Sequence, residues 1–254
     1  MENSSAALSS TEAERIANRI EPVEDGGAAL VVRDLCKSFR HPMKGSVDVL
    51  RRASFFVNEG EIVAIMGASG AGKTTLLHLI AGIEQADAGE IVFHRFDVTR
   101  ADEATLARWR RESLALVFQA HRLLPDLTTL ENVALPLLIA RRSRREAQER
   151  AGRLLARVGL SDRSAHSVVR LSAGEQQRAA IARALISTPS LLLADEPTGN
   201  LDPQTAADVV ELLIALCREH RTTALIVTHN EQVAQRCDRA LFIEGGMIRR
   251  STRW

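Results

Sequence analysis

The chain has 254 residues, a length that suits one large α/β domain with room for a smaller subdomain. Its 33 basic residues are nearly cancelled by 32 acidic ones, and the resulting net charge of +1 argues against a general role in nucleic-acid binding. The three cysteines (Cys36, Cys217 and Cys237) are too scattered for a disulfide framework or a structural zinc site, which favours a reducing compartment.

Residues 1–28 are rich in Ser, Ala, Glu and Gly and hold too few large apolar side chains to build a core. We predict a flexible leader here. Thr11 and Glu14 have the spacing of a capping box, which would allow a short helix over Thr11–Ile20. The leader is acidic and lacks the basic and apolar regions of a secretory signal.

From Ala29 onward, apolar β-rich runs alternate with helical stretches. The predicted strands are Leu30–Leu35, Glu61–Met66, Leu114–Phe118, Leu191–Asp195, Ala224–Thr228 and Ala240–Glu244. The predicted helices follow Lys73, Glu131, Arg144, Glu175, Thr205 and Asn230. Alternation of this kind predicts an α/β fold with a mostly parallel sheet, and the near-continuous apolar runs predict strands covered on both faces. Within the domain over residues 29–254, the segment 102–187 is mostly helical and is predicted to be an inserted helical subdomain.

A glycine-rich segment, GASGAGKT, joins the apolar run Ile62–Met66 to a predicted helix over Thr75–Ile80. It matches the phosphate-binding pattern G-x-x-x-x-G-K-[ST] in the context that pattern requires. Its residues are Gly67, Ala68, Ser69, Gly70, Ala71, Gly72, Lys73 and Thr74, followed by Thr75. Glycines let successive N–H groups point at phosphate oxygens, and the helix N-terminus adds positive potential. Lys73 is expected to reach the β- and γ-phosphates of a nucleotide, and the Thr74 hydroxyl to ligate Mg²⁺; a purely structural interpretation is a glycine-rich turn with an exposed lysine.

Two carboxylates stand at the end of the apolar run LLLADE. Ligands of open α/β sheets sit at such strand ends. In phosphoryl transfer one acid helps to hold Mg²⁺ and a second group activates the attacking water, roles that suit Asp195 and Glu196 respectively. Pro197 then breaks the strand. Without the upstream loop, the pair could equally be an acidic strand cap.

The segment LSAGEQQRAAIARAL, which begins at Leu171, resembles the signature of ABC ATPases, usually written LSGGQ. Further motifs follow the order of that family over about Leu30 to Arg250: the glutamine of VFQ, the aspartate of GNLD, the histidine of VTHN and an upstream aromatic residue. These residues are Gln119, Asp202, His229 and Phe39. The family resemblance implies a P-loop NTPase fold with an antiparallel β part on the N-terminal side. It also implies that the cofactors are ATP and Mg²⁺.

The resemblance assigns a role to each matched position. Catalytic roles fall to Glu196, His229 and Gln119, and Mg²⁺ contacts to Thr74, Gln119 and Asp195. Nucleotide contacts outside the loop fall to Phe39, Ser172, Ala173, Gly174, Glu175 and Asp202. Two positions depart from the usual signature: an alanine replaces the second-position glycine, which puts the turnover rate in question, and Glu175 replaces a glutamine.

Each of these residues also has a purely structural interpretation. Ser172 and Glu175 have capping-box spacing, so they could simply begin a helix. Phe39 could be a core aromatic residue, whereas His229 and Gln119 could be ordinary polar residues at strand ends. Ser172→Ala separates cap from function, because a lost cap costs about 1 kcal/mol of stability whereas a lost phosphate contact costs orders of magnitude in rate.

The resemblance implies a head-to-tail dimer in which each ATP lies between the loop of one copy and the signature of its mate. No apolar run reaches the roughly 18 residues that a membrane span needs, so we expect a separate integral membrane permease, with this chain at the cytoplasmic face of the inner membrane. Membrane contact would be made through the permease, and no nucleic acid is expected.

The segment HRLLPDLTTLENVALPLLIARR, over residues 121–142, is similar to ATPase subunits of lipoprotein-releasing (Lol) systems and, less closely, to those of macrolide exporters. Thr128 and Glu131 in this segment have the spacing of a capping box. Leu130, Val133, Leu137 and Leu138 are spaced as one apolar helix face, which could pack internally or dock a permease. Two further classes of protein compete with a transporter subunit. A soluble ABC protein would carry paired ATPase sets or long coiled coils, and a different P-loop enzyme would lack the signature.

Overall fold

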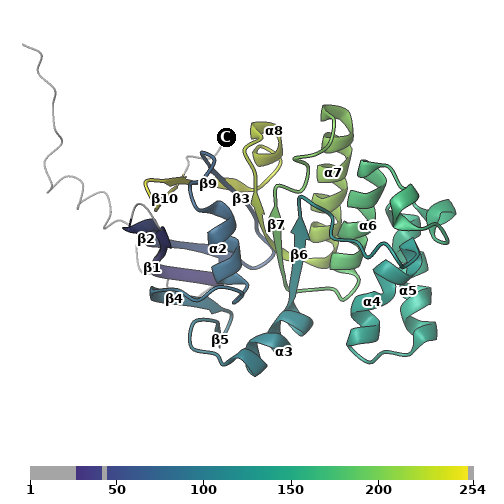
Figure 1. Cartoon of the computed structure of the whole chain (residues 1–254), viewed down its shortest axis with the longest axis horizontal. Helices are drawn as coiled ribbons and strands as arrows, with labels where there is room; N and C mark the ends of the chain where they lie inside the picture. Colours follow the sequence, from purple (N-terminus) through teal and green to yellow (C-terminus); the bar gives the residue numbers. More distant parts are fainter. Residues whose placement is uncertain (1–26, 42–44, 251–254) are drawn as a thin grey trace, which may run out of the picture.

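The computed structural model describes residues 27–41 and 45–250, so most of the predicted leader lies outside the described residues. A six-stranded sheet runs through the centre of the molecule in the order β10-β9-β3-β8-β7-β6 (Figure 1). Its strands are β3 (Ile62–Gly67), β6 (Leu114–Phe118), β7 (Leu191–Asp195), β8 (Thr223–Val227), β9 (Arg239–Glu244) and β10 (Met247–Arg250). All neighbours in this sheet are parallel except β9 and β10, which confirms the predicted sheet.

A second sheet, of antiparallel strands in the order β2-β1-β4-β5, forms the N-terminal side of the molecule. Its strands are β1 (Ala28–His41), β2 (Gly45–Asn58), β4 (Ala88–Phe93) and β5 (Phe96–Asp97). The antiparallel part is therefore confirmed, but the apolar runs of the sequence indicated only the start of β1. The reason is visible in β2, whose first residues are exposed and whose buried residues alternate with less buried ones.

Helices cover both faces of the central sheet. The helices of the described residues are α2 (Lys73–Ile80), α3 (Glu103–Ser113), α4 (Thr129–Ile139), α5 (Arg144–Arg157), α6 (Ala173–Leu185), α7 (Pro203–His220) and α8 (Glu231–Ala234), with 3₁₀ turns η1 (Ser161–Arg163) and η2 (Val168–Arg170). Figure 1 shows α4, α5 and α6 gathered at the end of the molecule far from the antiparallel sheet. This group corresponds to the predicted helical subdomain, although β6 of the central sheet also falls within residues 102–187.

Alternation of side chains along the strands divides the interior into two cores. On β3, Val63 and Ile65 belong to the core shared with α2 and the antiparallel sheet, whereas Ile62 and Ala64 belong to the core shared with α4 to α7. The apolar residues of α2 and of α6 lie in different cores. The two helices that carry the phosphate loop and the signature therefore pack against opposite faces of the central sheet.

The predicted apolar face of α4 is divided between two environments. Val133 and Leu137 are buried in the core, so internal packing accounts for them. Leu138 and the adjacent Ile139, at the end of the helix, remain 37% and 60% exposed. Among the described residues, no helix has the length and apolarity to cross a bilayer.

Candidate nucleotide-binding site

Glycines shape the loop between β3 and α2. Gly67 has a φ of 153° and Gly72 a φ of 95°, and neighbouring atoms also exclude side chains at both positions. A Cβ at Gly67 would lie 2.7 Å from the carbonyl oxygen of Ile243, and one at Gly72 would lie 2.6 Å from Cγ1 of Val49. Gly70 also has a positive φ, of 77°. The loop thus has the curled backbone that a phosphate cradle requires, with Ala68 and Ser69 exposed and Ala71 half-buried along it.

The helix that follows this loop lacks the usual N-terminal cap. Gly72 provides no side-chain hydrogen bond to α2, and the first turn of α2 holds no acidic residue. By contrast, the other described α-helices begin at a side-chain cap: Asp102, Thr128, Ser143, Ser172, Asp202 and Asn230. The N–H groups at the start of α2, which include those of Thr74 and Thr75, are therefore available to an anion.

Lys73 and Thr74, the predicted nucleotide and Mg²⁺ ligands, both form hydrogen bonds at the loop. The Lys73 ammonium donates to the carbonyl oxygens of Gly67, at 2.9 Å, and Ala68, at 3.0 Å, which holds it against the inside of the loop. The Thr74 hydroxyl donates to Asp195 Oδ2 at 2.8 Å. A hydroxyl beside a carboxylate offers the hard oxygen ligands that Mg²⁺ prefers. The described residues hold no group of three or more His, Cys, Asp or Glu side chains able to bind a metal.

Glu196 and His229 meet at the ends of adjacent strands β7 and β8. The Nδ1 atom of His229 lies 2.8 Å from Glu196 Oε1, and the backbone N–H of His229 donates to Glu196 Oε2 at 3.4 Å. Glu196 has a φ of 47°, an uncommon conformation for a residue with a side chain. It is held by a hydrogen bond from its N–H to the Val227 carbonyl at 2.9 Å. A half-buried carboxylate fixed in a strained conformation suits a group that must present itself to a reacting water.

Gln119 follows β6 and points toward the turn after Glu196. Its amide donates to Asn200 Oδ1 at 3.1 Å, and Asn200 in turn donates to the Gln119 carbonyl at 3.4 Å. Gly199 permits this approach, since a Cβ there would lie 2.8 Å from Gln119 Nε2. The sequence singled out Gln119 but not Asn200, which carries no local signal of this pairing.

The signature residues form the first turn of α6. Ser172 and Glu175 make a reciprocal capping box: Ser172 N–H donates to Glu175 Oε2 at 2.8 Å, and Glu175 N–H donates to the Ser172 hydroxyl at 3.3 Å. Ala173 is exposed and opens the helix, and it is not among the residues with positive φ. The alanine therefore fits the backbone at this position without strain.

The N-termini of α6 and α7 lie against each other. A Cβ at Gly174 would stand 2.4 Å from Cγ2 of Thr205, so this glycine is required by close helix packing. Asp202 caps α7 by accepting from Thr205 N–H at 3.1 Å. Hydrogen bonds from the side chain and the backbone of Thr205 lower the pKa of Asp202. The structure therefore gives Asp202 a capping role, and its contact with nucleotide stays a prediction.

Phe39 lies on β1 directly opposite Val47 of β2. It is 40% exposed, so the interpretation as a core aromatic residue is wrong. The Lys37 ammonium lies 4.9 Å from the centre of the ring. Because Val49, two residues beyond Val47 on β2, contacts the loop at Gly72, the exposed ring stands on the same sheet region that borders the phosphate loop.

Beside the Glu196–His229 pair is a cavity of about 160 Å³. Its lining residues are Glu196, Thr198, Gly199, Leu201, Pro203, Ala206, His229 and Asn230. The structure thus brings together Thr74 with Asp195 and Glu196 with His229. Among the described residues, no hydrogen bond joins the signature to the phosphate loop.

Comparison with known proteins gives consistent matches over most of the chain. The ABC transporter family profile matches residues 50–199. The lipoprotein-releasing system ATP-binding protein LolD of Myxococcus xanthus (strain DK1622) is 46% identical over 222 residues, covering 87% of this chain and 98% of that protein. LolD of Porphyromonas gingivalis (strain ATCC BAA-308 / W83) is 45% identical and covers 85% and 96%. A dimeric post-hydrolysis structure of the ATP-binding cassette MJ0796, bound to ADP and Pi, matches with a TM-score of 0.81 at 34% identity, covering 88% of this chain and 98% of that one.

Proposed function

The chain belongs to the ABC transporter family of ATP-binding domains, and on that premise we propose that it is the ATP-hydrolysing subunit of a transporter that releases lipoproteins from a membrane. Its substrate is ATP, with Mg²⁺ as the accompanying ion. The single observation that carries the catalytic proposal is the convergence of Thr74, Asp195, Glu196 and His229 at the edge of one sheet.

Binding of MgATP is assigned to the loop and its surroundings. Backbone N–H groups around Gly72 and at the start of α2 receive the phosphates. Lys73 would exchange its loop carbonyls for phosphate oxygens. Thr74, Asp195 and Gln119 would hold Mg²⁺. Phe39 offers an exposed ring on which adenine can stack, a contact that typically contributes about 1–3 kcal/mol per base.

Hydrolysis is assigned to the strand ends of β7 and β8. Glu196 accepts the proton of the attacking water, a general-base contribution of about 10²–10⁴-fold in rate. His229, hydrogen-bonded to Glu196 at 2.8 Å, orients that carboxylate and reaches toward the γ-phosphate. When bound, Mg²⁺ supplies positive charge that offsets the negative charge developing on the phosphate oxygens.

Two copies are required for a complete site. The helices that carry the loop and the signature, α2 and α6, pack on opposite faces of the sheet, which favours a site that two copies complete. A head-to-tail dimer achieves this by placing the signature of one copy over the loop of the other. The dimeric MJ0796 structures support this arrangement.

The transported class follows from the LolD relatives, which are named as ATP-binding proteins of the lipoprotein-releasing system. The chain lies at the cytoplasmic face of the inner membrane, bound to a separate permease, for which the exposed Leu138 and Ile139 at the end of α4 offer an apolar contact. Reconstitution with its permease in proteoliposomes is expected to give ATP-dependent loss of a lipoprotein from the membrane. ATP-dependent macrolide export without lipoprotein release would instead support the second candidate, a macrolide-type exporter.

Glu196→Gln tests the catalytic assignment. The variant is expected to bind ATP, to lose about 10²-fold or more of its turnover and to accumulate as a dimer by size-exclusion chromatography in ATP. Glu244→Gln, the same change at the end of β9 in the same sheet, is the matched control and should hydrolyse normally. A Glu196→Gln protein that turns over at the wild-type rate would refute the role given to Glu196.

A further inference from the structure

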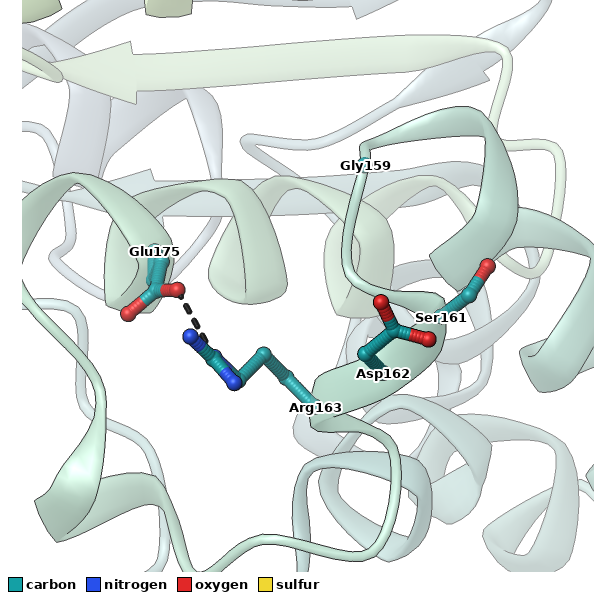
Figure 2. A pocket seen from close by; sticks show the side chains of 5 residues that line it. All are labelled: Gly159, Ser161, Asp162, Arg163 and Glu175. Carbon is teal, nitrogen blue, oxygen red and sulfur yellow. Dashed lines mark hydrogen bonds and ion pairs between the residues drawn. The ribbon is translucent and has the colours of Figure 1, made fainter.

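The signature glutamate is paired with an arginine that no motif includes. Arg163, at the end of the 3₁₀ turn η1, donates from Nε to Glu175 Oε1 at 3.0 Å (Figure 2). The other carboxylate oxygen, Oε2, accepts the Ser172 N–H at 2.8 Å. One carboxylate thus joins the cap of α6 to η1, with the Glu175 side chain 19% exposed and that of Arg163 47% exposed.

Glu175 carries a full negative charge in this position. The hydrogen bond from the Ser172 backbone and the one from Arg163 lower the pKa of its carboxyl group. The usual signature has a neutral glutamine here, which can make the same cap without the charge. A carboxylate in the first turn of α6 therefore places a negative charge next to the serine that is expected to meet the triphosphate of the partner copy.

The cavity beside Glu175 holds one positive charge. Glu175 and Arg163 line a cavity of about 340 Å³ together with Gly159, Ser161 and Asp162, so Arg163 is the one cation among its lining residues and Asp162 is a second acid (Figure 2). Arg178, one turn along α6, lies beside Gly174, where its Nη1 is 3.9 Å from the position of an added Cβ. No ion pair between Arg178 and Glu175 is found in the described part of the chain.

We propose that Arg163 is a positioning residue of the composite ATP site: it neutralises Glu175 and fixes the Ser172 cap, so that this turn of α6 can accept the γ-phosphate held by the partner copy. This inference rests on the proposed two-copy function. The competing explanation is an ordinary exposed ion pair, which contributes little to stability and nothing to catalysis.

The two explanations differ in what Arg163→Ala changes. If Arg163 neutralises Glu175, Arg163→Ala should lower both turnover and ATP-driven dimer formation by about tenfold or more at low ionic strength. This is the scale expected for an unpaired carboxylate close to a phosphate. The defect should shrink in higher salt, because ions screen such a repulsion. Binding of a fluorescent ADP analogue to the monomer should stay within about twofold of wild type, since the phosphate loop is untouched.

A double-mutant cycle with Glu175→Gln tests whether Arg163 acts through the charge of Glu175. Arg163→Ala is made both in the wild-type chain and in the Glu175→Gln chain, and its effect on kcat and on the ATP concentration for half-maximal dimerisation is compared. In the Glu175→Gln background the effect should fall to less than about twofold, whatever Glu175→Gln does alone. Arg157→Ala, which breaks the exposed Arg157–Glu219 pair elsewhere on the surface, is the matched control.

Two results would overturn the inference: a wild-type rate for Arg163→Ala, or an equally large loss from Arg163→Ala in both backgrounds, which would mean that the arginine acts independently of the charge on Glu175. Failure of the proposed function looks different, because then the wild-type chain itself neither hydrolyses ATP nor dimerises with it.

Discussion

At the scale of single residues, the site depends on conformations that most residues avoid. Glu196 has a φ of 47° and is held by backbone hydrogen bonds to Val227 and from Gly199. The cost of such a conformation is of the order of 1–3 kcal/mol. The fold maintains it, and the carboxylate consequently projects toward His229 and the adjoining cavity rather than along the strand.

Phe39 allows a clean test of base stacking, because its exposed ring contributes little to the core. Phe39→Ala is expected to weaken ATP binding by about tenfold, within the range of base–aromatic stacking energies, and to leave the unfolding midpoint nearly unchanged. Titration with a fluorescent ATP analogue measures the affinity. Val47→Ala is the matched control, since Val47 lies directly opposite on β2 and is equally exposed, at 39%. Equal losses of affinity in both variants would contradict a specific role for the ring.

At the scale of secondary-structure elements, the helices α4 and α6 begin with the same capping motif. Thr128 and Glu131 form a capping box at α4, and Ser172 and Glu175 form one at α6. Both were predicted from the sequence, because the pattern depends on residues only three positions apart. The hydroxyl residues of the two boxes differ in exposure: Thr128 is half-buried, whereas Ser172 is exposed beside Ala173.

Removing the cap residues Thr128 and Ser172 one at a time therefore distinguishes a contribution to stability from a contribution to ATP hydrolysis. Ser172→Ala and Thr128→Ala are each expected to lower the free energy of unfolding by about 1 kcal/mol, as measured by urea denaturation. Only Ser172→Ala should also lose most of its ATPase activity per folded molecule, because only this hydroxyl is proposed to contact phosphate. Normal turnover by the Ser172→Ala protein would leave Ser172 with the capping role alone.

At the scale of the whole molecule, capping carboxylates make stability depend on pH. The backbone N–H and hydroxyl of Thr128 lower the pKa of Glu131, and the pKa values of Asp102 and Glu175 are shifted downward in the same way. A depressed folded-state pKa means that the ionised group stabilises the folded chain. This stabilisation is complete above the unfolded value, about 4.3 for a glutamate, and disappears as the pH falls through the lower folded value.

We therefore expect the urea concentration at the unfolding midpoint to decrease as the pH is lowered from about 6 to about 3.5. Glu131→Gln should flatten this dependence, since a glutamine keeps the hydrogen bond and has no proton to gain in that range. Glu149, which forms an exposed ion pair with Arg145, provides the control. Glu149→Gln removes a surface carboxylate that takes no part in a capping box. A Glu131→Gln protein with the wild-type pH dependence would contradict the contribution of this cap.

The sequence by itself mostly determined features that depend on neighbouring residues. The buried parallel strands, the phosphate loop and both capping boxes depend on residues a few positions apart, and the order of the motifs indicated the family. Half-exposed β2 and β4 were missed, since their burial depends on the sheet they join. The resemblance assigned Thr74 and Asp195 to one site, but only the tertiary structure decided their direct hydrogen bond across 121 positions. It also decided that Arg163 pairs with Glu175 and that α2 and α6 cover opposite faces of the central sheet. Such pairings depend on strand order and helix packing, which no short-range periodicity encodes.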